Sequence, residues 1–248
     1  QPIGDRLWNA ALIVVGVLMV LYCAHYLFRS FPPSMVVSAF LLGLPTLIRV
    51  LVLIALASLV WVPVGVYVGL RPNLAAAVQP LAQMMAAFPA NLVFPLAVWA
   101  IVALNLDPDI WLSPLMVLGT QWYILFNVIA GASVIPRELK DASSNLRLKG
   151  WSWWRNFALP SVFPYYLTGA ITASGGSWNA AIVSEWVGWG DKHIAAHGIG
   201  AYIAEATKEG AMDRVVLGIL VMVVYVIGLN RLLWRPLYAL AERKYRMS

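Results

Sequence analysis

The sequence predicts an all-α, polytopic membrane protein with about six transmembrane helices. Of its 248 residues, 61% are hydrophobic and 11% are charged, and the mean hydropathy is +0.77. Soluble domains carry roughly 25% charged residues, so a soluble core could not bury this much apolar surface. The 12 Trp and 10 Tyr suit the two interfaces of a bilayer with water. We therefore expect a single transmembrane domain over residues 1–248.

Six apolar segments account for the expected helices, because about 20 helical residues cross a bilayer. They cover residues 7–28, 41–70, 74–104, 110–133, 160–187 and 215–234. The third is interrupted by Phe88-Pro89-Ala90-Asn91, and proline removes a helix hydrogen bond and kinks the chain. We interpret it as one broken span rather than two complete ones.

Turns and charges separate these spans. The first ends at Arg29, before Pro32-Pro33, and the second ends at Arg71-Pro72-Asn73. Arg49 lies near the start of the second span, where a long side chain can snorkel to the interface. The acidic turn Asp107-Pro108-Asp109 precedes the fourth span.

The basic residues predict the orientation of the chain. They concentrate in the 137–160 loop and in the tail after residue 234, and both should face the cytoplasm. An even number of spans then places the N- and C-termini in the cytoplasm. This topology leaves Arg29, Lys192, Lys208 and Arg214 on the outside, yet the overall bias favours it.

Composition and motifs argue against an enzyme. No phosphate-binding glycine loop, zinc-hydrolase helix or serine-nucleophile elbow occurs. Cys23 is the only cysteine, and His193 and His197 are two candidate ligands that fit a solvated external loop better than a metal site. The net charge of +6 is explained by cytoplasmic loops rather than by nucleic acid. We expect no catalytic residue, no metal and no nucleic-acid partner.

The fifth span carries a stripe of small residues and one acid. Small residues every four positions allow close approach of another helix, although lining of a transport pathway is the alternative. An acid at membrane depth indicates function, although Glu185 would also fit the outer interface. The candidates for pathway lining or helix packing are Gly169, Ala173, Ser177, Trp178, Asn179 and Glu185.

The charged insert between the fourth and fifth spans predicts a short helix over residues 136–150. Pro136 suits a helix start, and Gly150 suits the position after a helix end. Ile135, Leu139, Ala142 and Leu146 would form one narrow apolar face. Such a helix either lies on the membrane or docks in a groove of another protein, and its residues alone leave both open.

This insert resembles the cytoplasmic loop of ABC importer permeases, which has the pattern Glu/Asp-Ala-Ala/Ser-x3-Gly and a later Leu-Pro. Asp141-Ala142-Ser143 match its start, and Leu159-Pro160 match its end. The family glycine falls on Arg147, which is a departure, and Gly150 follows three residues later.

Three other segments are similar to nitrate-, sulfonate- and taurine-type permeases. They are residues 78–104, residues 175–190 with Trp178 and Glu185 at matching places, and residues 197–206 with Gly198 and Gly200 matched. Residues 145–179 also resemble a subgroup with two permease halves fused in one polypeptide, which would fit a chain that begins at Gln1.

The resemblance implies a type I ABC importer permease fold in a bacterial inner membrane. Residues 1–36 would form a peripheral first helix and residues 37–248 a five-helix core. The partners would be a second permease half, identical or fused, a cytoplasmic ABC ATPase dimer that binds the ATP, an external or periplasmic binding protein, and the lipid bilayer. The chain itself would need no cofactor.

The same resemblance implies the coupling residues and the cargo. The ATPase-coupling residues would be Leu139, Asp141, Ala142, Ser143, Leu146, Arg147, Gly150, Leu159 and Pro160. The cargo would be a small anion or a sulfonate- or nitrate-like solute. An ion-coupled secondary transporter is the alternative, and the lack of an inverted repeat and the few intramembrane charges speak against it.

Overall fold

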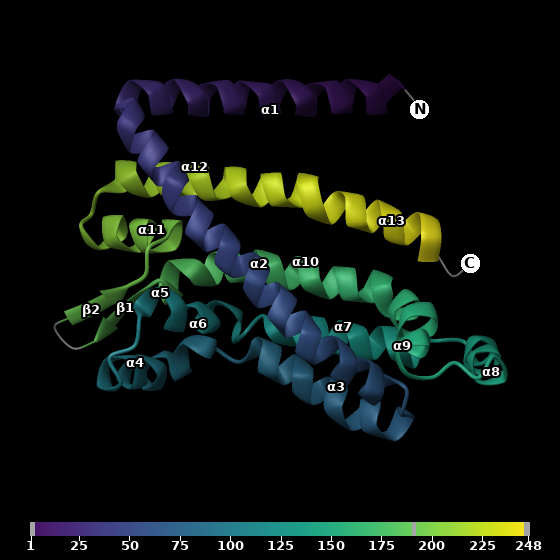
Figure 1. The fold of residues 1–248 in the computed structure, drawn as a ribbon. Helices are drawn as coiled ribbons and strands as arrows, with labels where there is room; N and C mark the ends of the chain where they lie inside the picture. The colour runs from purple at the N-terminus through teal and green to yellow at the C-terminus, as the bar shows by residue number, and fades with distance from the viewer. Residues whose placement is uncertain (1–2, 190–191, 246–248) are drawn as a thin grey trace.

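The structure, a computed structural model, describes residues 3–189 and 192–245 as a bundle of helices (Figure 1). The long helices are α1 (Ile3–Ser30), α2 (Pro33–Gly69), α10 (Leu159–Ser184) and α12 (Met212–Leu229), which η3 (Asn230–Trp234) joins to α13 (Arg235–Tyr245). The shorter ones are α3 (Pro72–Ala87), η1 (Ala90–Val93), α4 (Phe94–Ala103), α5 (Pro108–Trp111), α6 (Ser113–Val117), α7 (Gln121–Ser133), α8 (Arg137–Asn145), α9 (Gly150–Trp153), η2 (Trp154–Ala158) and α11 (Ile199–Lys208).

The described strands form one small antiparallel hairpin of β1 (Trp186–Trp189) and β2 (Lys192–Ala195), with Trp186 opposite Ala195. It follows α10 and includes His193, for which the sequence predicted a solvated external loop. The expected all-α class is confirmed, with this hairpin as its one exception among the described residues.

Three described helical stretches are long and apolar enough to cross a membrane: Pro33–Gly69, Pro108–Ser133 and Met212–Arg243. The pair Pro72–Ala87 and Ala90–Ala103 makes a fourth if it is one span. Its halves are bent by 77° where Pro89 interrupts the helix, so the expected break is present.

The count of six spans stays a prediction, because two of the expected spans, residues 7–28 and 160–187, are not among these apolar stretches. α10 has 26 residues, but its serines, threonines and glycines make it less apolar than these stretches. These residues suit a helix that packs against protein in the middle of the bundle. For α1, the described apolar stretch is Ala10–Met19, within a helix of 28 residues.

The core lies where α2, α7 and α10 pack together, and α12 covers its other side (Figure 1). Ile124 of α7, Leu167 of α10 and Leu217 of α12 are fully buried there. Gly169 of α10 permits close approach of α7, because a Cβ atom there would lie 2.6 Å from the Tyr123 carbonyl oxygen.

The two ends of the bundle differ in composition. One end, called here the α8 end, carries α8 and α9 and also the start of α1 and the end of α13 (Figure 1). The opposite end, called the hairpin end, carries the hairpin, α5 and α11 (Figure 1). The helix α10 runs between them and links α9 to the hairpin.

Candidate functional site

The first candidate site is α8, a nine-residue helix at the tip of the α8 end (Figure 1). Pro136 is its N-cap residue and Glu138 lies in its first turn, where an acid interacts favourably with the helix dipole. The helix ends at Asn145. It is therefore five residues shorter at its C-terminus than the sequence predicted.

Arg147 explains this early end. Its φ is 48°, in the left-handed region, and its N–H donates to the Ser144 carbonyl at 2.9 Å. The next residue, Leu148, donates its N–H to the Ser143 carbonyl at 3.1 Å. These two bonds form a Schellman motif, whose left-handed position favours glycine. Arg147 thus occupies the place where the resemblance puts a glycine.

The expectation that Gly150 terminates this helix is wrong. Gly150 also has a positive φ, 54°, but it begins the next helix, α9. Leu146 to Lys149 form the turn between the two helices. The physical reason is that the Schellman bonds already satisfy the carbonyls of Ser143 and Ser144, so the helix has closed before Gly150 is reached.

The predicted apolar face of α8 divides into a buried and an exposed part. Ile135, just before the helix, is buried in the core, and Ser143 is the buried residue of the helix itself. Leu139 is 40% exposed and Leu146 is 72% exposed, and Ala142 and Asp141 are exposed as well. The chain therefore leaves the apolar side of α8 uncovered.

The chain returns from α8 into the bundle through α9 and η2. Trp153 packs edge-on against Trp154, with ring centroids 5.2 Å apart, and against Phe157 at 5.4 Å. Leu159 and Pro160 form the first turn of α10, as expected of a segment that opens a span. The helices α9 and η2 lie between these two residues and α8. Their closeness to Leu146 in the sequence therefore does not by itself place them on the same surface.

The predicted small-residue stripe of α10 is a packing face. Gly169, Ala173 and Ser177 are buried, and the Ser177 hydroxyl lies 3.0 Å from the Thr120 hydroxyl. Trp178 is also buried and stacks on Tyr225 of α12, with ring centroids 6.0 Å apart. Helix packing, the first of the two readings, therefore accounts for these four candidates.

Another face of α10 is exposed and polar, and sequence reasoning missed it except for Asn179. Its members, Thr168, Thr172, Gly175 and Asn179, are spaced four, three and four apart and are all exposed. Nothing lies within 4 Å of a Cβ atom placed on Gly175. We call these four residues the polar stripe. Helical spacing could have revealed it, but the neighbouring small-residue stripe gave the stronger pattern.

The second candidate site is a charge network at the hairpin end, centred on Glu185. This carboxylate is only 1% exposed. Its Oε1 accepts from the Thr46 hydroxyl at 2.8 Å and from Arg49 Nη1 at 2.9 Å, and its Oε2 accepts from the Gly200 N–H at 2.8 Å. Glu185 is therefore buried inside the protein and does not lie in an exposed interface. Its charge is compensated by Arg49 and by the N-terminus of α11.

Arg49 connects this carboxylate to a second acid. Its Nη2 forms an ion pair with Asp109 Oδ1 at 2.8 Å, and its Nη1 donates to the His197 carbonyl at 2.7 Å. Asp109 Oδ1 also accepts the His197 N–H at 2.6 Å, and its Oδ2 lies 2.8 Å from His197 Nδ1. The expectation that Arg49 snorkels to the interface is wrong, because two carboxylates hold its guanidinium inside the protein.

We call these five residues, Thr46, Arg49, Asp109, Glu185 and His197, the Glu185 network. They come from four separate parts of the chain, so sequence reasoning selected Glu185 as a site candidate but did not connect it with Arg49, Asp109 or His197. The signal that could have found Arg49 is its charge within the otherwise apolar 37-residue helix α2.

Two glycines make the network possible. A Cβ atom at Gly198 would collide with the Glu185 carboxylate, and one at Gly200 would collide with the Ala181 carbonyl oxygen of α10. The glycines therefore let the start of α11 approach both the end of α10 and the buried acid. This is the physical reason for the glycine pair that the resemblance matched.

The two histidines do not form a common ligand set. His193 stacks on Trp186, with ring centroids 5.1 Å apart, whereas His197 pairs with Asp109. Within residues 3–189 and 192–245, no group of three or more His, Cys, Asp or Glu side chains is arranged to hold a metal ion.

Comparison with known proteins agrees with this geometry. The family model of the binding-protein-dependent transport system inner membrane component matches residues 61–246. The bicarbonate transport system permease protein CmpB of a Synechocystis species is 30% identical over 168 residues, which are 66% of this chain and 56% of CmpB. The nitrate import permease protein NrtB of a Synechocystis species is 26% identical over 188 residues, which are 75% of this chain and 64% of NrtB.

The chain thus spans little more than half the length of CmpB. The family match nevertheless covers well over half of the chain and includes α8, the polar stripe and Glu185, although it begins after Arg49. The resemblance found in the sequence is confirmed, and so is the all-α membrane permease fold. The chain belongs to the family of binding-protein-dependent transport inner-membrane components, the permease subunits of ABC importers.

Proposed function

We propose that this permease imports a small oxyanion of the nitrate or bicarbonate type, driven by cytoplasmic ATPases that hold α8. A second permease half would complete the pathway, and an external binding protein would deliver the solute. The α8 end and both chain ends would then face the cytoplasm of a bacterial cell. The observation that carries the proposal is the uncovered apolar side of α8, at the tip of the bundle.

The anchoring of α8 supports a coupling role. Ile135 before the helix and Leu148 after it both pack on the main core, and the Schellman bonds close its end. A helix that is held at both ends and apolar on its free side suits a partner's groove. The two ends of α8 lead directly into α7 and toward α10. Displacement of α8 would therefore move these core helices and open a transport pathway alternately to the two sides of the membrane.

The polar stripe supports a pathway along α10. A polar face would be costly against lipid, so it suits contact with water, with the solute or with a second permease half. The Thr172 hydroxyl donates to the Thr168 carbonyl at 2.8 Å, and the Thr168 hydroxyl donates to the Pro164 carbonyl at 3.2 Å. These hydroxyls are thus satisfied within the helix and still expose their oxygens. Sulfonates fit the same stripe, and the two relatives favour the smaller planar anions.

The test is uptake by the full-length protein in proteoliposomes, together with its ATPase and binding protein. We expect labelled nitrate or bicarbonate to accumulate only with ATP inside, and not with an ATPase that cannot hydrolyse it. Uptake that survives the inactive ATPase but collapses without a proton gradient would overturn the proposal in favour of ion-coupled transport. Sulfonate uptake in place of both anions would overturn the proposed cargo alone.

A further inference from the structure

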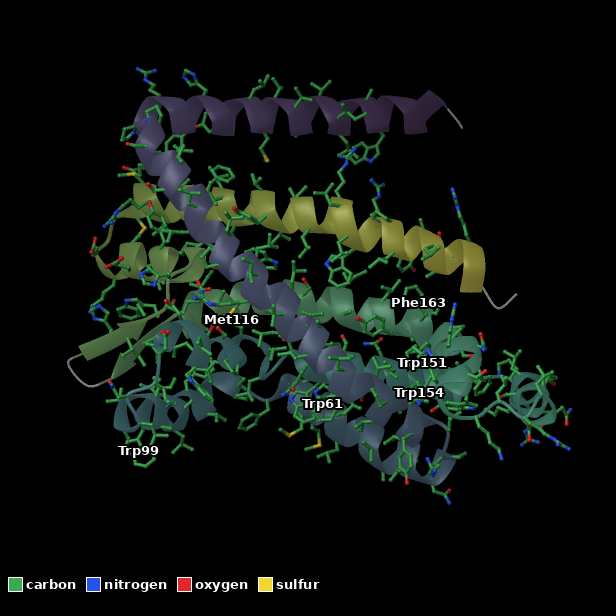
Figure 2. All side chains as sticks on the ribbon, in the orientation of Figure 1. Trp61, Trp99, Met116, Trp151, Trp154 and Phe163 are labelled. Carbon is green, nitrogen blue, oxygen red and sulfur yellow. The ribbon has the colours of Figure 1, made fainter. Side chains whose placement is uncertain are left out.

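An apolar groove of about 770 Å³ lies at the α8 end, between α2, η2, α10 and α13. Its walls include Leu59 of α2, Phe163 of α10 and Leu240 of α13. Figure 2 shows Phe163 near Trp151 and Trp154, which also line the groove, at the junction of α9 with α10. Leu59, Trp151 and Leu240 are exposed, so the groove is open at the surface of the chain.

The groove is separate from the polar stripe. Phe163 and Thr172 are nine positions apart on α10, which is about 180° around a helix of 3.6 residues per turn. None of Thr168, Thr172, Gly175 and Asn179 lines it. An apolar wall on the opposite side of α10 does not suit a small oxyanion, so the groove calls for a different occupant.

The charge at the groove is positive. Arg155 lines it, and no lining residue is an acid. Within the described part of the chain, no carboxylate forms an ion pair with Arg155. Arg243 lies one helical turn after Leu240 and so on the same side of α13. The groove thus combines a long apolar wall with a cationic mouth.

The depth of the groove suits one leaflet of a bilayer. Its α10 wall runs from Leu159 to Tyr166, a rise of about 10 Å. Half of a hydrocarbon core of about 30 Å is about 15 Å. Ser58 and Tyr166, whose hydroxyls lie 3.0 Å apart, also line the groove. Trp151 of α9 and Trp154 of η2 also line the groove, and tryptophan favours the interface of a bilayer with water.

We propose that this groove binds an anionic phospholipid, with its phosphate at Arg155 and an acyl chain against Leu59, Phe163 and Leu240. Basic pockets between helices at the cytoplasmic side recognise lipid head groups through their negative charge. The apolar wall explains why the occupant carries a hydrocarbon chain, and Arg155 explains why its head is negative. The site needs neither the coupling role of α8 nor a particular solute.

The test is native mass spectrometry of the full-length protein in detergent with added dioleoyl phosphatidylglycerol or dioleoyl phosphatidylcholine. We expect the wild type to retain the anionic lipid at least fivefold better. Arg155→Gln should bring the two lipids to equal retention, whereas Arg231→Gln, a control for an exposed arginine outside the groove, should leave the preference intact.

A second pair of variants tests the apolar wall. Leu59→Trp should fill the groove and lower retention of both lipids, and Leu56→Trp, an exposed position on α2 outside it, should not. Equal retention of the two lipids by the wild type would overturn the proposal. So would a Leu59→Trp protein that keeps its lipid but loses a dimeric mass, because the groove would then be an interface with a second copy.

Discussion

At the scale of single residues, two positions hold conformations or charges that need support from the surrounding structure. Arg147 adopts a left-handed conformation that L-residues avoid, and Glu185 carries a carboxylate at 1% exposure. Arg147 is exposed and its strain is local, whereas Glu185 depends on groups from distant segments. We therefore expect substitution of Arg147 to have a local effect, and loss of a partner of Glu185 to affect the stability of the whole protein.

Arg147→Gly should stabilise the C-terminal end of α8. A left-handed conformation costs an L-residue about 1–2 kcal/mol of stability. Glycine avoids this cost but loses roughly 0.5–1 kcal/mol more backbone entropy on folding. The net gain, about 0.5–1 kcal/mol, should slow amide hydrogen exchange at Arg147 and Leu148 by about two- to fivefold. Lys149→Gly is the control, because the φ of Lys149 is −139° and glycine relieves nothing there. Equal or faster exchange in Arg147→Gly would contradict the Schellman assignment.

Arg49→Gln should destabilise the protein strongly, because it leaves the Glu185 carboxylate buried without its counter-charge. Removing one partner of a buried pair costs about 3–5 kcal/mol. Adding Glu185→Gln to Arg49→Gln should restore part of this loss, since the uncompensated charge is then gone. Thermal unfolding of the single and double variants in detergent measures the coupling. Additive losses would show that the two side chains do not stabilise each other.

At the scale of secondary structure, α8 and α10 each present an exposed face that this chain does not cover. The face of α8 is apolar and lies at the tip of the bundle, and the polar stripe lies along a central helix. Exposed apolar residues on a short helix suit a protein groove, and exposed polar residues at membrane depth suit a solute or water. Each face predicts a variant that should fold but fail in one activity.

Leu146→Asp should strongly weaken capture of the ATPase without preventing membrane insertion. The side chain is 72% exposed, so its replacement should change folding stability by about 0.5 kcal/mol or less. A buried apolar contact with the partner would be lost, and we expect at least tenfold weaker capture in a pull-down. Asp141→Lys should act in the same direction through charge. The matched control is Leu104→Asp, a residue 67% exposed beyond the end of α4. Unchanged capture by both α8 variants would refute docking of α8.

Asn179→Trp should block uptake while leaving ATPase capture intact. The polar stripe is exposed at this position, and a bulky indole would fill the space beside α10. We expect at least a tenfold fall in the initial rate of uptake in proteoliposomes. Ile227→Trp on α12, at an exposed position in an apolar helix, is the control and should transport normally. Normal uptake by Asn179→Trp would remove the stripe from the pathway.

At the scale of the whole molecule, α10 joins the α8 end of the bundle to the hairpin end. The Glu185 network fastens α2, α5 and α11 to its C-terminal end, whereas its N-terminal end continues through η2 and α9 to the turn after α8. A displacement of α8 would therefore be transmitted along α10 toward a hairpin end held by the Glu185 network, in which the Arg49–Glu185 pair is buried. The small-residue face of α10, packed on α7, permits this central position.

The sequence by itself determined the membrane class, the break near Pro89, the short helix before Leu159 and the family, because these depend on composition, local periodicity and short motifs. It overestimated the length of α8, since only the backbone bonds of Ser143 and Ser144 reveal that the helix closes at Arg147. The tertiary structure alone decided that Arg49 and Asp109 meet Glu185, and which side of α10 stays exposed. The physical reason is that ion pairing and burial depend on segments far apart in the chain, whose approach no local pattern encodes.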